Sequence, residues 1–192
     1  MSSIDAKLPA AARLRSLPVI SATVVAMALV AAVQGSVADA VLRAVLVALL
    51  VPCALIDLER RVIPNRITGP GSLLAVALGL VLAPGSESAR LIWALGAGGF
   101  LLVAALANPA GMGMGDVKLV GMMGLFLGPP VAVALLLALL ATIVTAVVLA
   151  LGRGVAAARK TALPFGPYLA AGGVIAAFAG TPLLHAYLSL HG

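Results

Sequence analysis

Long apolar runs separated by short polar clusters dominate the 192 residues of the chain. Because roughly 20 apolar residues cross the ~30 Å hydrocarbon core of a bilayer, the runs can be counted as membrane spans. There are seven, at 17–34, 37–56, 67–83, 91–107, 117–127, 131–151 and 164–188. The pattern predicts an all-α, polytopic membrane helix bundle of about seven transmembrane spans.

The fifth run, 117–127, is the shortest and stops at a helix breaker. A helix over these residues would reach only about half-way through the hydrocarbon core. The next residues are Gly128-Pro129-Pro130, and proline both lacks an amide proton and clashes with the preceding turn. This run therefore predicts a short or tilted span, and the count falls to six if it is re-entrant.

The composition excludes a soluble globular domain. Hydrophobic residues make up 63% of the chain and charged residues only 9%, against about 25% charged residues in soluble domains. We expect residues 1–16 to form a polar, cytoplasmic N-terminal leader and residues 17–192 to form a single transmembrane domain. The leader runs into the first span without a small-residue cleavage site, so we expect no cleavable signal peptide.

The net charge is +6, and the distribution of the basic residues is typical of a membrane protein rather than of a nucleic-acid-binding protein. If the spans alternate in direction, ten of the twelve basic residues fall on one side, and only Arg43 and Arg90 fall on the other. The positive-inside rule then places the N-terminus in the cytoplasm. We expect a multi-pass protein of the cell inner (cytoplasmic) membrane that binds no nucleic acid, with its oligomeric state left open.

Two of the rare acids, Asp57 and Asp116, stand at the ends of apolar runs on the cytoplasmic side of this topology. Two carboxylates about 3 Å apart cannot both ionise comfortably, so they share a proton. One can then act as general base toward water while its protonated partner polarises a scissile carbonyl. The pair predicts a peptide-hydrolysing site, although each acid alone is equally well explained as a solvated cap or loop residue.

Three alternating glycines precede the second acid in Gly111-Met112-Gly113-Met114-Gly115-Asp116. Residues without side chains allow positive φ angles and a close approach of a substrate strand. A flexible loop with Asp116 as a helix cap would have the same composition.

Three sequence blocks give a more specific resemblance. Gly113-Met114-Gly115-Asp116 matches the GxGD motif of intramembrane-type aspartyl proteases, and with Val117-Lys118-Leu119 it resembles the bacterial type IV prepilin peptidases. The stretch from Ile56 to Thr68, with Pro64 and Asn65 seven and eight residues after Asp57, resembles a second block of that family. Pro164-Phe165-Gly166-Pro167-Tyr168 resembles a third. Together they cover about residues 51–169.

The resemblance implies that Asp57 and Asp116 are the catalytic pair of a prepilin leader peptidase. Its substrates would be prepilin or pseudopilin precursors, cleaved at the cytoplasmic face after a short basic leader. It implies no metal and no cofactor for this reaction. Larger relatives also carry a cysteine-rich region and methylate the new N-terminus. A single cysteine, Cys53, cannot supply that zinc site, so we expect a short form with peptidase but without methyltransferase activity.

Six residues near the acids are candidates for substrate binding. Lys118 either contacts the substrate backbone or extends to the membrane interface, and the 164–166 segment either lines the site or begins a helix. The six are Gly113, Gly115, Lys118, Pro164, Phe165 and Gly166. Asn65 is expected to cap the helix that follows Pro64.

Two other hypotheses remain open at this point. A small proton- or cation-coupled transporter could also use two interfacial acids, although transporter sites usually lie near the bilayer midplane between broken helices. A non-catalytic scaffold would tolerate loss of both acids. On the opposite side of the membrane, Asp39 and Arg43 are one helical turn apart and are expected to pair.

Overall fold

The computed structural model describes residues 19–20, 22–29, 36–108, 112–154 and 164–189, and every regular element within these ranges is helical. The predicted leader, 1–16, lies outside the described residues. Within the first apolar run, residues 19–20 and 22–29 are helical, and the remainder of that run is not described.

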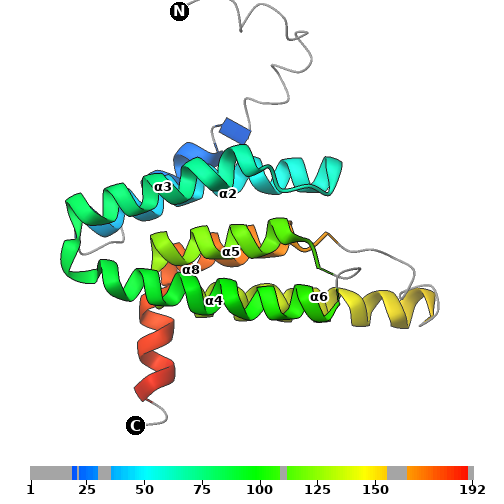
Figure 1. Ribbon diagram of the computed structural model, residues 1–192. Coiled ribbons are helices and arrows are strands. Elements are labelled where there is room, and N and C mark those ends of the chain that lie inside the picture. The colour runs from blue at the N-terminus through cyan, green and yellow to red at the C-terminus, as the bar shows by residue number, and fades with distance from the viewer. Residues whose placement is uncertain (1–18, 21, 30–35, 109–111, 155–163, 190–192) are drawn as a thin grey trace, which may run out of the picture.

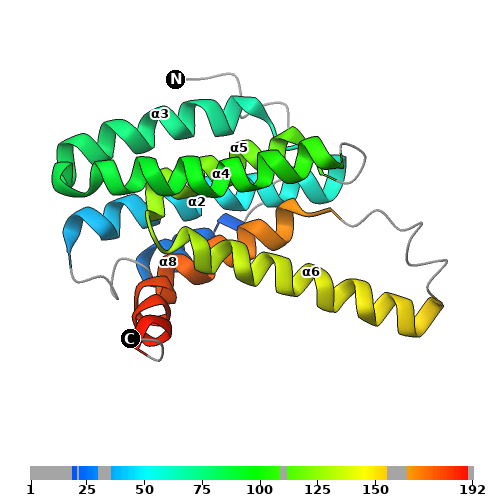
Figure 2. The ribbon, with the colours of Figure 1, turned by 60° about the horizontal axis from the view of Figure 1, so that its bottom comes forward.

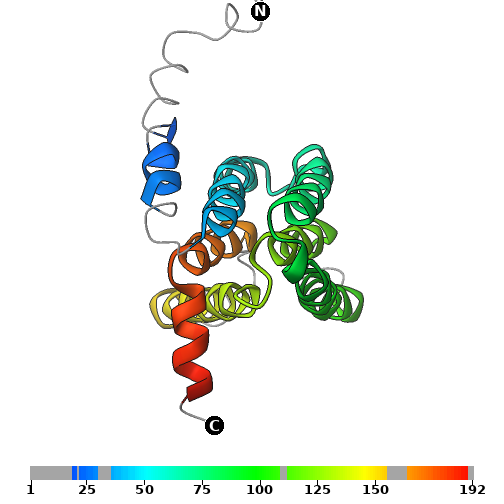
Figure 3. The ribbon, with the colours of Figure 1, turned by 90° about the vertical axis from the view of Figure 1, so that its left-hand side faces the viewer.

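Six helices and one 3₁₀ turn make up the body of the described chain. They are α2 (Val37–Arg60), α3 (Asn65–Leu82), the turn η2 (Pro84–Ser86), α4 (Glu87–Ala107), α5 (Met114–Leu127), α6 (Val131–Arg153) and α8 (Gly166–Ser189). Viewed end-on, they form three layers of two: α2 beside α3, α8 beside α5, and α6 beside α4 (Figure 3). The layer of α8 and α5 therefore lies in the middle, as the side view also shows (Figure 1).

Five segments of the described chain are long and apolar enough to cross a membrane. They are α2, α3, α4 together with η2, α6, and α8 up to Leu184. The prediction of a polytopic helical membrane bundle is thus confirmed. The fifth predicted span is different, because α5 has only 14 residues and does not qualify as a membrane-crossing helix.

The short helix α5 is apolar on all sides and lies at the centre of the bundle. Its buried residues include Leu119, Val120, Met122, Met123 and Phe126, and on the opposite side of the helix Gly121 and Leu125 are part-buried. A helix that is apolar all round is stable only when it is surrounded. Helices α2, α3, α4, α6 and α8 all contact α5, so protein rather than lipid covers most of it.

Small residues bring these helices into close contact. A side chain at Gly124 of α5 would collide with the backbone of Ala94 in α4, and one at Gly172 of α8 would collide with the carbonyl of Ala134 in α6. Glycine and alanine let helix backbones approach in lipid, where no hydrophobic force drives helices together. The Ala- and Gly-rich segments therefore act in packing.

Successive helices alternate in direction, so the bundle has two chemically distinct ends. The aspartate end, at the right in Figure 1, contains the end of α2 with Asp57 and the start of α5 with Asp116. The arginine end, at the left, contains the start of α2 with Arg43 and the start of α4 with Arg90. Figure 2 shows α6 extending past its neighbours at the aspartate end.

Candidate active site at the aspartate end

Asp57 lies in the last turn of α2 and is only 6% exposed. The helix stops one turn later because Arg61 adopts a left-handed conformation, with φ at 53°, and its amide donates to the carbonyl oxygen of Asp57 at 2.8 Å. A left-handed residue of this kind is a common way to end a helix. The carboxylate is thus held on the buried face of α2 at its very end.

The amide of Gly166, the first residue of α8, donates a hydrogen bond to the carboxylate of Asp57. A Cβ atom at this glycine would lie 2.6 Å from Oδ2 and 2.9 Å from Cγ of Asp57. Only a residue without a side chain allows this approach. The first amides of a helix have no partner within the helix and favour an anionic group, so the start of α8 holds Asp57 in place.

The 164–166 segment therefore both begins a helix and reaches the aspartate end. Gly166 does so directly, and Phe165 packs against the hydrophobic core while its carbonyl accepts from the amide of Leu169 at 3.1 Å. Pro164 precedes the helix and is half-buried. Of these three residues, Gly166 is the one for which a hydrogen bond and a close approach to an aspartate have been described.

Asp116 is the third residue of α5, and Gly113 is the N-cap of that helix. The carboxylate of Asp116 accepts from the amide of Gly113, and the amide of Asp116 donates to the carbonyl of Gly113 at 3.1 Å. An acid at the third helical position that reaches back to the cap residue is half of a capping box. The expectation that Asp116 itself is the cap residue is therefore wrong.

The glycines before Asp116 act through close packing rather than through unusual backbone angles. Gly113 has a φ of −82°, and Gly115 also has no positive φ. Neither glycine therefore adopts the positive φ that its lack of a side chain allows. Gly111 lies outside the described residues. A Cβ atom at Gly115 would lie 2.9 Å from Cβ of Ile63, in the loop that follows α2. Gly115 thus lets the start of α5 approach the end of α2.

The two acids are close enough for the charge of Asp57 to act on Asp116. Burial above all, and then the charge of Asp57, raise the pKa of Asp116 from 3.8 to about 6, while the hydrogen bond from Gly113 opposes the shift. Asp116 precedes the apolar run of α5 and is outside the five candidate spans. Among the described residues, no lysine or arginine forms an ion pair with either acid, so a shared proton is the favoured way to limit their repulsion.

Lys118 hydrogen-bonds to α3 rather than to either acid. Its Nζ donates to Oδ1 of Asn65, the first residue of α3, at 3.0 Å, and both line a groove of about 620 Å³ between α3, α4 and α5. The N-cap of α3 is Pro64, and no side chain caps the helix, so the expected capping role of Asn65 is wrong. The link between Lys118 and Asn65 joins residues 53 apart, and no local pattern indicates it.

Within the part of the chain that the structure describes, His, Cys, Asp and Glu side chains do not gather into a group of three or more that could hold a metal ion. Cys53 is buried in α2 among apolar neighbours, as expected for a small packing residue.

The sequence matches the type IV leader peptidase family over residues 44–151, a stretch that contains both Asp57 and Asp116. The chain belongs to this family. The match begins in α2 and ends in α6, so it also includes the whole of α5, the helix that carries Asp116.

Curated relatives agree with this family assignment. The chain is 31% identical over 150 residues to the prepilin leader peptidase/N-methyltransferase of Bacillus subtilis (strain 168), covering 76% of this chain and 58% of that protein. It is 33% identical over 165 residues to the protein of the same name from Aeromonas salmonicida (strain A449), covering 81% and 53%. The chain therefore spans a little over half the length of these relatives. No solved structure matches it.

Proposed function

We propose that this member of the type IV leader peptidase family is a membrane aspartyl endopeptidase that removes the leader peptide of prepilin-like precursors. The observation that carries the proposal is the approach of Asp57 and Asp116, two acids from distant parts of the chain, at one end of the bundle. Neither forms an ion pair with a lysine or arginine among the described residues, although the charge of Arg61 acts on Asp57. The names of the relatives supply the substrate class.

In the proposed mechanism, the two carboxyl groups hold one proton between them. The ionised member takes a proton from a water molecule, whose oxygen attacks the carbonyl carbon of the scissile peptide bond. The protonated member donates a hydrogen bond to the carbonyl oxygen and stabilises the negative charge that forms there. When the C–N bond breaks, the leaving nitrogen receives a proton from the pair, which returns the site to its starting state.

Two backbone amides hold the acids during this cycle. Gly166 donates to Asp57 from the start of α8, and Gly113 donates to Asp116 from the cap of α5. Because these donors belong to helix ends rather than to mobile side chains, they fix both carboxyl groups without neutralising them. Of the six candidate substrate-binding residues, we retain Gly115, Lys118, Pro164 and Phe165 in that role and assign Gly113 and Gly166 to holding the acids.

We further propose that the aspartate end faces the cytoplasm. Arg60, Arg61 and Arg66 lie around the loop between α2 and α3, Lys118 is the fifth residue of α5, and Arg153 ends α6, so five basic residues of the described chain lie at this end. The positive-inside rule favours this orientation. We propose with it a cytoplasmic N-terminus and a location in the inner membrane. The proposed cleavage takes place at the cytoplasmic face.

A proton- or cation-coupled transporter is less well supported. Asp57 lies at the last turn of α2 and Asp116 in the first turn of α5, so both are at the end of the bundle rather than half-way along it. Transporter sites usually lie near the midplane. The absence of methyltransferase activity stays a prediction, and the proposal here concerns the peptidase reaction alone.

Co-expression with a pilin precursor tests the function directly. We expect the wild-type chain to convert the precursor to a faster-migrating form, and either Asp57→Asn or Asp116→Asn to reduce the cleavage rate by about 10³-fold or more, because each removes one half of the acid–base pair. Glu59→Gln is the matched control, since Glu59 is an exposed acid on the same turn of α2 as Asp57. Cleavage that persists in both asparagine variants would rule out the proposed mechanism.

A further inference from the structure

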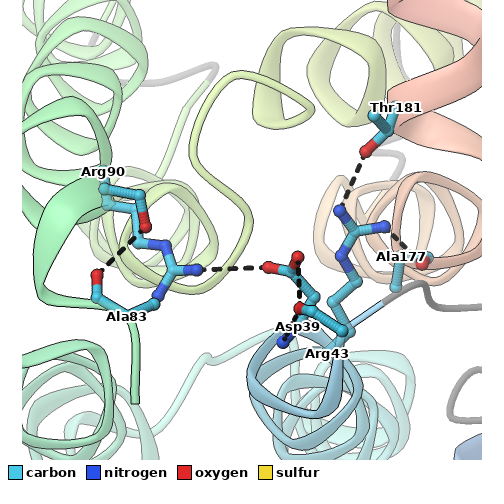
Figure 4. Close-up of polar contacts among 8 residues, drawn as sticks. Asp39, Arg43, Ala83, Arg90, Ala177 and Thr181 are labelled. Carbon is cyan, nitrogen blue, oxygen red and sulfur yellow. Dashed lines mark hydrogen bonds and ion pairs between the residues drawn. The ribbon is translucent and has the colours of Figure 1, made fainter. Parts of the chain in front are cut away.

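A cavity of about 320 Å³ lies at the arginine end, opposite the aspartates. It is bounded by the first turns of α2 and α4, the Gly128–Pro130 turn between α5 and α6, and the distal part of α8. Figure 4 shows Arg43 and Arg90 on either side of Asp39, beside that turn. The peptidase mechanism uses none of these residues.

Most of the polar side-chain atoms around this cavity have hydrogen-bond partners within the described chain, but one nitrogen of Arg90 does not. Oδ1 of Asp39 accepts from Nη2 of Arg90 at 3.3 Å, and Oδ2 accepts from the hydroxyl of Ser36 at 2.9 Å. Arg43 donates to the carbonyl of Ala177 at 3.2 Å and to the hydroxyl of Thr181 at 2.8 Å. Nη1 of Arg90 has no partner among the described residues, although Arg90 is only 5% exposed. A buried donor without an acceptor is costly.

The charges that line the cavity leave a positive surplus, because two guanidinium groups face one carboxylate. The turn adds no free amide: Pro129 and Pro130 have none, and the amide of Gly128 donates to the carbonyl of Gly124 at 2.8 Å. What the cavity lacks is therefore an acceptor that carries negative charge. At about 30 Å³ for each water molecule, its volume is ample for an oxyanion and part of the group attached to it.

We propose that this cavity binds a phosphate oxyanion, with Nη1 of Arg90 as the principal donor and Arg43 as the second positive charge. The planar guanidinium group matches phosphate oxygens in geometry and charge. The cavity lies where the helices end, so either the phosphate of a lipid headgroup or a free phosphate can reach it. This site does not depend on the proposed peptidase activity.

A neighbouring acid, Glu87, offers a substitution that should change anion binding in the opposite direction to Arg90→Gln. Glu87 is one turn before Arg90 in α4, is 4% exposed, and has no partner for either carboxylate oxygen among the described residues. Its carboxylate faces Gly79 of α3 and does not line the cavity. Its charge nevertheless lowers the affinity for an anion nearby, so Glu87→Gln should strengthen binding while Arg90→Gln should abolish it.

The first arm of the test measures lipid. The purified full-length chain is placed in nanodiscs of phosphatidylcholine with 20% phosphatidylglycerol, extracted, and analysed by native mass spectrometry for retained phosphatidylglycerol. We expect one lipid per wild-type chain, at least about tenfold less with Arg90→Gln, and more with Glu87→Gln. Arg66→Gln, an exposed arginine at the aspartate end, is the matched control and should retain the wild-type amount.

The second arm measures inorganic phosphate. The melting temperature in detergent is compared in phosphate and in chloride at equal ionic strength, for the wild type, Arg90→Gln and Glu87→Gln. A phosphate-specific rise in melting temperature that is lost in Arg90→Gln and larger in Glu87→Gln supports a free anion as the ligand. A response in the lipid measurement alone supports a lipid headgroup. Either result supports the site. The site is overturned if neither probe responds, or if both variants respond as the wild type does. Should Arg90→Gln fail to fold, an unchanged response in Glu87→Gln is sufficient to overturn it.

Discussion

Asp39 at one end of the bundle and the pair of Asp57 and Asp116 at the other have opposite kinds of partner. At the arginine end, Asp39 is neutralised by Arg90 in an ion pair of 3.3 Å. At the aspartate end, Asp57 and Asp116 each accept a backbone amide, the charge of Asp57 acts on Asp116, and no lysine or arginine of the described residues forms an ion pair with either, although the charge of Arg61 acts on Asp57. The acid at the arginine end serves structure by pairing with a buried guanidinium group. An acid that accepts a backbone amide and forms no ion pair keeps its ability to exchange a proton, which is what hydrolysis requires.

The largest effect after loss of an aspartate is expected from the glycine that holds one. Gly166→Ala places a methyl group against the Asp57 carboxylate, and a shift of about 1 Å in a reacting group can lower the rate by about 100-fold. We expect the cleavage rate to fall by about 10–100-fold. Gly96→Ala is the matched control, because a Cβ atom there meets nothing within 4 Å. Equal rates in the two variants would show that the start of α8 does not hold Asp57.

The pH profile distinguishes a buried acid beside a second acid from an ordinary one. If Asp116 must be ionised for one step, its pKa of about 6 predicts a rate at pH 4.5 roughly 30-fold below the plateau. An acid with the ordinary pKa of 3.8 would lose only about a sixth of the rate at that pH. The measurement is the rate of peptide cleavage in detergent from pH 4.5 to 8, with folding checked at each pH by circular dichroism. A flat profile down to pH 5 would contradict the assignment of Asp116 as the group that titrates.

The same substitution should change stability in opposite directions at the two ends. A raised pKa means that the folded state favours the protonated form of Asp116. Its contribution to the free energy of unfolding is therefore fully present below pH 3.8 and is lost as the pH rises through about 6. Asp116→Asn should therefore melt about 2–4 °C higher than the wild type at pH 8, after allowance for its partial exposure. The difference should narrow at pH 4.5.

Asp39→Asn should instead melt lower, because it leaves the guanidinium group of Arg90 buried without a counter-charge. Its effect should also exceed that of Arg90→Gln, since Asp39 is 42% exposed at the side chain and water can solvate it once alone. Thermal unfolding of the three variants at pH 8 checks both statements. A stabilising Asp39→Asn would remove the contrast between the two ends.

The smallest effect is expected at Lys118. Its exposed hydrogen bond to Asn65 is worth about 1 kcal/mol or less. If Lys118 also contacts the substrate, Lys118→Ala should raise KM by about 2–5-fold and leave kcat unchanged. Asn65→Ala separates the two roles, because it removes the same hydrogen bond but leaves the lysine in place. An identical KM in both variants would assign Lys118 to the α3–α5 contact alone.

The helices and the acids could be predicted from the sequence, because apolar runs and rare charges are local signals. The partners of the charged residues could not. Asp39 and Arg43 have the spacing of a helical pair, yet Arg43 donates to Ala177 and Thr181 of α8. Asp39 pairs instead with Arg90, 51 residues further along the chain. Local spacing favoured Arg43 as the partner of Asp39, but the packing of the helices places Arg90 beside it instead.

The glycines show the same limit. The motif around Gly113 and Gly115 could be recognised, but the conformation assumed for it was wrong, since Gly115 makes room for Ile63 and neither residue adopts positive φ. The contact between Gly166 and Asp57 joins the start of α8 to the end of α2, and nothing in the local pattern around either residue encodes it. Close approaches between distant segments become visible only when the helices are in place.

The short central helix has a consequence for the surroundings in which the protein works. Asp116 is carried by α5, which its neighbours shield, whereas Asp57 is carried by α2, whose Leu55 and Leu58 are exposed on the outer surface. A thinner or thicker bilayer acts on the tilt of the long outer helices but has little hold on a shielded one. We therefore expect the separation of the two carboxyl groups, and with it the rate of hydrolysis, to depend on the acyl-chain length of the host membrane.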